Sequence, residues 1–214
     1  MTNHATKTLV AGLVSTAIAL AAQIPKRAEQ KAENEVARPL PLPAPFDVSS
    51  YFHPSGWMGD WGQIGRLHVD LDAAYRGKPR PGSPNGLCIK VTYRGATWAG
   101  VYWQYPDGNW GKEPGRTVTG ANRVTFWAAG DKGGEVVEFK AGGIDAHGDG
   151  IKYRDTFEVP MSLTSLSQQW KAFEISLAKQ DLSDVIGAFA CTIHADTSKK
   201  ESTTTIYIDQ IRYE

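Results

Sequence analysis

Cysteine, net charge and long hydrophobic runs are all scarce in this chain of 214 residues. Its 2 cysteines cannot complete a zinc site, and its 5 histidines show no zinc-ligand spacing. Lysine and arginine together number 23, as do aspartate and glutamate, so the chain is formally neutral. Nucleic-acid binding relies on a strongly positive surface. The composition therefore argues against a nucleic-acid partner.

The apolar run Thr8–Leu20 is too short for a comfortable membrane span. It follows a basic N-terminus, and Ala19-Leu20-Ala21 offers small residues three before and one before a cut after Ala21. We therefore predict a signal peptide over residues 1–21 and a secreted or periplasmic protein with no membrane span after cleavage. An uncleaved anchor is the alternative.

A charged and then proline-rich segment follows the signal peptide. It ends in Arg-Pro-Leu-Pro-Leu-Pro-Ala-Pro, a composition that buries little apolar surface and favours an extended spacer. We expect a linker over residues 22–45 and one folded domain over residues 46–214. That domain carries 18 basic and 20 acidic residues and is long enough for an ordinary hydrophobic core.

The folded part contains no long stretch with the 3.6-residue apolar period of a helix. Short runs rich in β-branched and aromatic residues alternate with turns of Gly, Pro, Asn and Asp. These runs predict an all-β domain, a two-sheet antiparallel β-sandwich of jelly-roll type. The expected strands are Leu67–Leu71, Leu87–Tyr93, Trp98–Tyr105, Arg123–Ala129, Val136–Ala141, Thr156–Val159, Lys171–Ser176, Val185–Ile193 and Thr204–Tyr213.

The segment from Trp98 to Trp110 holds five aromatic residues in thirteen positions. Alternate side chains of a strand point to opposite faces, so apolar parity separates the core from the open face. The predicted core residues are Ile89, Val91, Tyr93, Val101, Trp103, Val124, Phe126, Val137, Phe139, Phe173, Ile175, Phe189, Ile193, Ile206 and Ile208.

The strand residues of the opposite parity, which lie on the open face, include large aromatic rings beside amide, hydroxyl and charged side chains. A flat ring covers the C–H edge of a sugar, and polar side chains exchange hydrogen bonds with its hydroxyls. We predict that three rings stack on a glycan on one face, with a fourth at the rim and three polar partners. The predicted binding residues are Trp98, Tyr102, Trp127, Trp110 at the rim, Gln104, Glu138 and Arg154. In the alternative, these rings form a satellite cluster beneath loops.

The C-terminal part carries a spaced pattern of aromatic, aliphatic and acidic residues. It reads Trp170-x-x-Phe173-x-Ile175-x-Leu177, then Asp181-Leu182-Ser183-x-Val185-Ile186-Gly187-x-Phe189, then Ile206-Tyr207-Ile208-Asp209-x-Ile211. This pattern resembles jelly-roll carbohydrate-binding modules of the galactose-binding-like superfamily, the kind found beside bacterial cellulases and xylanases. The resemblance implies noncatalytic glycan binding and often a structural calcium ion near the chain ends. It places Asp209 at the position of a calcium ligand.

The resemblance does not identify the second acidic calcium ligand, for which Asp47, Asp60 and Asp70 are all candidates. Asp145, His147 and Asp149 lie within five residues in a Gly-rich loop, and its oxygen-rich spacing could also hold calcium. It lacks the regular Asp-x-Asp-x-Asp-Gly spacing, so we expect solvated turn residues there.

Cys88 and Cys191 form an even pair, which permits a disulfide in an exported protein. The strand parity puts Cys191 on the core face and Cys88 on the other face. Their Cβ vectors then diverge, and we expect no bridge.

The sequence shows no recognisable set of catalytic residues. Glycoside hydrolysis needs two carboxylates about 5–9 Å apart, and Glu138 and Glu158 would be neighbours only if their strands pair suitably. A Gly-x-Ser-x-Gly elbow is absent. We expect a monomer that binds a plant, algal or bacterial polysaccharide or oligosaccharide without catalysis. The alternatives are an exported envelope protein that contacts another protein, and a jelly-roll glycoside hydrolase or polysaccharide lyase.

Overall fold

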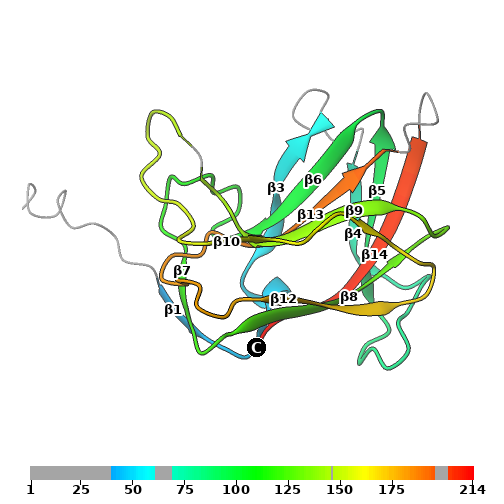
Figure 1. Ribbon diagram of the computed structural model, residues 1–214, viewed down its shortest axis with the longest axis horizontal. Coiled ribbons are helices and arrows are strands. Elements are labelled where there is room, and N and C mark those ends of the chain that lie inside the picture. Colours follow the sequence, from blue (N-terminus) through cyan, green and yellow to red (C-terminus); the bar gives the residue numbers. More distant parts are fainter. Residues whose placement is uncertain (1–39, 61–68, 146, 196–201) are drawn as a thin grey trace, which may run out of the picture. The chain divides into compact units, whose positions relative to one another are not determined.

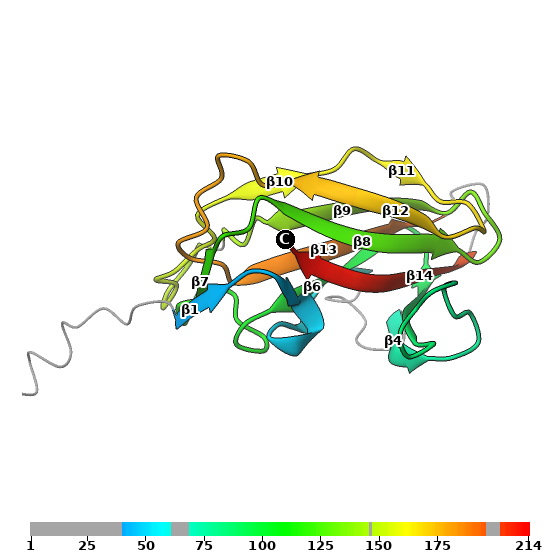
Figure 2. The same ribbon diagram turned by 90° about the horizontal axis from the view of Figure 1, so that it is seen from below.

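Alternating apolar residues give each short strand one buried face, and two sheets of such strands pack against each other. The computed structural model describes residues 40–60, 69–145, 147–195 and 202–214. Figure 1 shows the two layers, and Figure 2 shows β8, β12 and β14 in front of β6, β9 and β13. The prediction of an all-β, two-sheet antiparallel sandwich is confirmed.

The first layer, called the β6 sheet below, has the strand order β10-β9-β13-β6-β3, and β11 also pairs with β9. All of its pairings are antiparallel. Its strands are β3 (His53–Gly59), β6 (Trp98–Gln104), β9 (Val136–Gly142), β10 (Glu158–Pro160), β11 (Thr164–Ser165) and β13 (Gly187–His194).

The second layer, called the β14 sheet below, has the order β12-β8-β14-β5-β4, and β2 also pairs with β14. These pairings are antiparallel as well. Its strands are β2 (Phe46–Asp47), β4 (Val69–Tyr75), β5 (Cys88–Gly95), β8 (Arg123–Gly130), β12 (Lys171–Ser176) and β14 (Ser202–Tyr213). A single 3-10 turn, η1 (Val48–Ser50), follows β2.

The proline-rich end of the expected linker belongs to the folded domain. Strand β1 (Leu40–Pro43) pairs in parallel with β7 (Arg116–Thr119), and Leu42 is buried against the core. The linker boundary at residue 45 is therefore wrong, because residues 40–43 form a paired strand and one leucine of the Leu-Pro repeat, Leu42, joins the core. Residues 1–39, with the expected signal peptide and most of the linker, lie outside the described residues.

The core between the sheets has the composition that strand parity predicts. Every predicted core residue is buried except Phe173, which is partly buried and packs against the same cluster. Phe126 and Phe139 meet edge to face with ring centroids 4.7 Å apart, and Phe189 contacts both. Burial of each such ring contributes about 1.5–3 kcal/mol before entropy is counted. Tight ring packing thus holds the two sheets together.

The two cysteines are free, as the parity predicts. Cys191 lies on β13 within the core, whereas Cys88 lies on β5 of the other sheet, where its Sγ contacts the carbonyl oxygen of Lys78. None of the described residues forms a helix with the length and apolar character that membrane crossing requires.

Candidate functional site: the outer face of the β6 sheet

Pairing in the β6 sheet aligns outward-facing residues in rows that cross the strands. Because Ala99, Val101 and Trp103 of β6 are buried in the core, the alternate residues face outward. In the first row Trp98 lies opposite His194 of β13.

The second row is small and polar. Gly100 of β6 lies between Met58 of β3 and Thr192 of β13, and Thr192 lies opposite Glu138 of β9. A Cβ atom at Gly100 would come within 2.7 Å of the Met58 methyl group and 3.1 Å of the Thr192 hydroxyl. A glycine here therefore lets the neighbouring side chains close over the strand.

The third row carries Tyr102, which faces Ala190 of β13, and Ala190 faces Lys140 of β9. Tyr102 is only 2% exposed, and its hydroxyl donates to the carbonyl oxygen of Gly142. Burial is the main reason that the pKa of Tyr102 rises to about 12. The ring is therefore a neutral, apolar floor for what lies above it.

Trp110 covers this floor. Its ring meets that of Tyr102 edge to face, with centroids 5.9 Å apart, and Tyr153 and Met58 pack against the same cluster. Trp110 and Tyr153 both remain partly exposed. The predicted rim tryptophan thus lies over a predicted stacking residue.

Asn109 holds the loop that carries Trp110. Its side-chain oxygen accepts hydrogen bonds from the backbone N–H groups of Gly111, Lys112 and Glu113, at 3.0–3.2 Å. The carbonyl oxygen of Gly111 in turn accepts from the N–H of Tyr153. One asparagine therefore orders the Trp110 loop, and that loop is joined directly to the Tyr153 loop.

Asp155 holds the loop that carries Tyr153. Its carboxylate accepts hydrogen bonds from the backbone N–H groups of Ile144 at 2.7 Å, Ile186 at 2.5 Å and Gly187 at 3.1 Å. The Ile144 and Ile186 side chains pack against Tyr102. Burial raises the pKa of Asp155 to about 7, although these donors pull it down.

Trp98 stands at the opposite side of the face and is 38% exposed. Its ring rests on Gly59, where an added Cβ would lie 2.7 Å from the ring and where φ is +71°. Only glycine adopts that backbone conformation at little cost and leaves room for the indole. The end of β3 thus supports a ring that solvent can reach.

Lys140 and Glu158 form an ion pair beside the floor, with Nζ and Oε1 2.9 Å apart. Burial alone would lower the pKa of Lys140, but its bonds with Glu158 and Tyr102 together raise it above its ordinary value. Glu158 lies opposite Gly142, four residues along β9 from Glu138. That register places the Cα atoms of the two glutamates roughly 13 Å apart along the sheet, and the Glu158 carboxylate is paired with Lys140.

Trp127 is not part of this face. It lies on β8 of the β14 sheet, opposite Ala172, and therefore points outward on the other side of the sandwich. The prediction that Trp98, Tyr102 and Trp127 share one surface is wrong. Parity assigns a side chain to a face of its own strand, but it does not assign the strand to a sheet.

The polar residues of the prediction are spread over different environments. Glu138 is on the face and partly exposed, whereas Gln104 is 0% exposed and accepts a hydrogen bond from Ser55. Gln104 is thus beneath the surface and not on it. Arg154 is exposed on the Tyr153 loop, with its Nη1 3.6 Å from Asp145.

Four residues of the face escaped the sequence analysis, namely Met58, Tyr153, Thr192 and His194. The predicted core positions Cys191 and Ile193 already implied that Thr192 and His194 face outward. No local pattern marked Met58 or Tyr153, because Met58 lies on β3, a strand interrupted by proline and glycine, and Tyr153 reaches the face through loop contacts.

Asp209 does not have the surroundings of a calcium ligand. Its Oδ2 accepts from the Nε of Arg80 at 2.8 Å, so a guanidinium already neutralises it. Asp47 pairs with Arg212, and Asp60 bonds with Thr97 and Tyr93. Within the described ranges, no three His, Cys, Asp or Glu residues gather as a metal site would need. The side chain of Asp70 lies outside the described residues.

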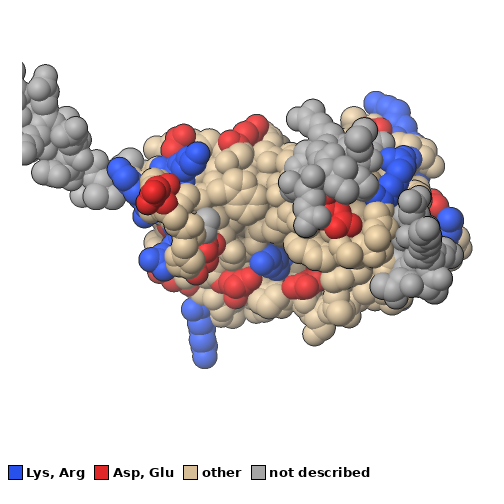
Figure 3. Space-filling view, turned by 90° about the horizontal axis from the view of Figure 1, so that it is seen from above, with Lys and Arg blue, Asp and Glu red and all other residues tan. Residues whose placement is uncertain are grey.

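Figure 3 views the molecule from the side of the β6 sheet, opposite to the view in Figure 2. Uncharged side chains fill much of the middle of this view, and charged ones lie at the left end, in the lower part and at the right end.

Comparison with known proteins found no matching family model and no matching curated protein. Among solved structures, the family 11 carbohydrate-binding module of the cellulosomal cellulase Lic26A-Cel5E of Clostridium thermocellum is 14% identical, with a TM-score of 0.45; the match covers 84% of this chain and 95% of that one. The family 30 module of the Clostridium thermocellum cellulase Cel9D-Cel44B is 15% identical, with a TM-score of 0.41, and the match covers 80% and 92%.

A further structure is the family 11 module from Clostridium thermocellum in complex with a β-1,3-1,4-mixed-linked tetrasaccharide. It is 16% identical, with a TM-score of 0.39, and the match covers 75% of this chain and 95% of that one. All three are carbohydrate-binding modules, the class that the C-terminal pattern resembles. The assignment of the fold rests on the strand pairing described above.

Proposed function

We propose that the chain binds a glycan noncovalently through the outer face of the β6 sheet. One observation carries this proposal: Trp98 and Trp110 are both partly exposed and stand on either side of the polar row Gly100, Thr192 and Glu138. The rows of Trp98 and of Tyr102, beneath Trp110, are roughly 13 Å apart along β6. That spacing leaves a strip between the two indoles for an extended ligand.

The chemistry of the strip supports a polyhydroxylated ligand. Indole faces bury the C–H surface of a sugar ring, while a hydroxyl and a carboxylate exchange hydrogen bonds with its hydroxyl groups. The two loops that carry Trp110 and Tyr153 are held by Asn109 and Asp155, so little order has to be gained on binding.

Affinity electrophoresis against soluble plant, algal and bacterial polysaccharides tests the proposal. Retardation by one of them is expected, and Trp98→Ala or Trp110→Ala should weaken the affinity about 5- to 150-fold, the equivalent of ~1–3 kcal/mol. Trp127→Ala is the matched control, because it removes the same side chain from the opposite face.

Two results would overturn the proposal. The first is that no polysaccharide retards the protein, and the second is that Trp127→Ala reduces affinity as much as Trp98→Ala does. Release of reducing ends or unsaturated products in the same assay would show catalysis instead of simple binding.

Export belongs to the same proposal. Residues 1–21 have the charge, apolar run and small residues of a signal peptide. N-terminal sequencing of the mature protein should therefore begin at Ala22, and an intact Met1 in the exported protein would contradict the cleavage.

A further inference from the structure

A connection between two strands crosses the outer face of the β14 sheet. We call residues 76–87, between β4 and β5, the strap. Lys78 of the strap donates a hydrogen bond to the carbonyl oxygen of Gly130, and its Nζ lies 4.8 Å from the ring centroid of Tyr207. The strap is therefore attached to the sheet at this end through backbone and ring contacts.

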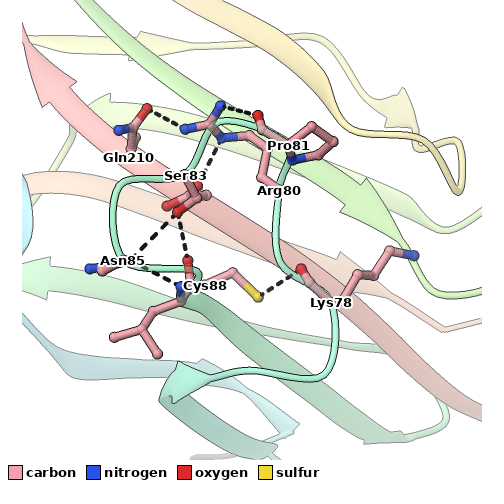
Figure 4. Close-up of polar contacts among 9 residues, drawn as sticks. Lys78, Arg80, Pro81, Ser83, Asn85, Cys88 and Gln210 are labelled. Atoms are coloured by element: carbon pink, nitrogen blue, oxygen red, sulfur yellow. Dashed lines mark hydrogen bonds and ion pairs between the residues drawn. The ribbon is translucent and has the colours of Figure 1, made fainter.

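Arg80 attaches the middle of the strap, and it is only 8% exposed. Its Nε donates to Asp209 at 2.8 Å, its Nη2 to Gln210 at 2.6 Å and its Nη1 to the carbonyl oxygen of Pro81 at 3.0 Å. The guanidinium carbon also lies 4.8 Å from the ring centroid of Trp127. Figure 4 shows the guanidinium group between Gln210 and Pro81.

The partner strand is shaped around this contact. The pairing of β14 with β8 shifts register between Asp209 and Arg212, and Gln210 within that bulge has φ of 50°. A non-glycine residue holds such a conformation only where its surroundings determine it. Here the bulge lets two successive side chains of β14 bond to one guanidinium.

We infer that Arg80 supplies, from within the chain, the positive charge that the buried carboxylate of Asp209 requires, so that the domain is stable without a divalent cation there. A buried carboxylate needs a charged, hydrogen-bonded partner. A guanidinium meets that need with a fork of N–H donors that a lysine cannot reproduce. A metal ion at the same oxygen would lie directly against the guanidinium and be repelled. The inference does not depend on glycan binding.

Thermal unfolding of the full chain tests it. The wild-type Tm should be the same in EDTA, in calcium chloride and in magnesium chloride. Arg80→Ala should lower the Tm by roughly 5–15 °C, because it leaves a buried carboxylate unpaired. Arg80→Lys should lower it less. Arg123→Ala is the matched control, since that arginine belongs to the same sheet but its side chain is 46% exposed in its ion pairs.

A double variant separates this pairing from simple loss of packing. Asp209→Asn in the Arg80→Ala background should restore part of the lost Tm, because the unpaired charge is gone. If Arg80→Ala does not fold, Asp209→Asn and Arg80→Lys take its place. Each of these two variants should then have a lower Tm than Arg123→Ala.

Three results would overturn the inference. They are a saturable rise of the wild-type Tm with calcium, an Arg80→Ala or Arg80→Lys protein no less stable than Arg123→Ala, and strictly additive losses for Arg80→Ala and Asp209→Asn.

Discussion

The two outer faces of the sandwich use similar residues in opposite ways. On the β6 sheet, Trp98 and Trp110 are partly open to solvent, and Lys140, whose Nζ lies 5.3 Å from the ring centroid of the buried Tyr102, is paired with Glu158. On the β14 sheet, each of three rings lies beneath a cation at 4.8 Å: Trp127 beneath Arg80, Tyr207 beneath Lys78 and Tyr75 beneath Lys90.

The difference teaches that an outward-facing ring is not by itself a binding site. What covers the ring decides whether a ligand can reach it. On the β14 sheet, Trp127 and Tyr75 are also partly exposed, but each has a cation over its ring, and Tyr207 is buried. On the β6 sheet, the Trp110 and Tyr153 loops cover Tyr102 but present rings of their own. The predictions below test whether the two faces are as distinct as these contacts imply.

The largest effect we expect is a pH dependence that comes from Asp155, beneath the open face. Burial raises its pKa from 3.8 to about 7, and in the unfolded chain the group returns to about 3.9. The folded state then binds the proton more tightly. The contribution of Asp155 to stability is fully present below about pH 4 and is lost as the pH rises through 7, by an amount on the order of a few kcal/mol.

Urea unfolding of the wild type and of Asp155→Asn between pH 5 and pH 8 checks this expectation. The amide does not titrate, so the difference in unfolding free energy between the two proteins isolates Asp155. That difference should fall as the pH rises. A difference that stays constant would show that the three backbone donors balance burial, and one that grows with pH would show that they outweigh it.

A smaller effect is expected on the covered face. Lys78→Ala should lower the free energy of unfolding by about 1–2 kcal/mol, because it removes both a cation–π contact and a hydrogen bond to Gly130. Its affinity for a glycan that wild type binds should not change. Denaturant titration and affinity electrophoresis provide the two readings, and a loss of affinity would mean that the β14 sheet also contacts ligand.

The smallest effect concerns two glutamates on opposite faces. Glu138→Ala removes a hydrogen-bonding group from the polar row and should weaken glycan binding several-fold, in line with about 0.5–1.5 kcal/mol for one hydrogen bond. Glu174→Ala on β12 of the β14 sheet should leave binding unchanged, and neither should alter stability by more than about 0.5 kcal/mol. Equal losses of glycan affinity in the two variants would show that the two faces do not differ in binding.

Much of the fold could be predicted from local patterns. Strand β12 has the expected bounds, and Trp103 and Phe126 are buried as their parity predicts. Strands β1 and β3 were missed, because proline and glycine interrupt the alternation that marks a strand. Leu42 is buried through pairing with a strand more than 70 residues away, a contact that no local pattern encodes.

The candidate site could be predicted only in part. Trp98 and Glu138 face outward on the β6 sheet as expected, and Trp110 lies beside Tyr102. Tyr102 and Gln104 have the predicted parity but are covered. The loop that carries Trp110 folds over Tyr102, and residues Ser55 and Gly56 of β3 lie against Gln104. No signal in the sequence distinguishes a covered outward position from an open one.

Alternation by itself determined which side of each strand turns toward the core, because successive side chains of an extended backbone must point in opposite directions. Only the tertiary structure decided which sheet each strand joined and what covered the two outer faces. Both depend on pairing and loop contacts between distant residues, as when Arg80 meets Asp209, and such contacts leave no periodic trace in the chain.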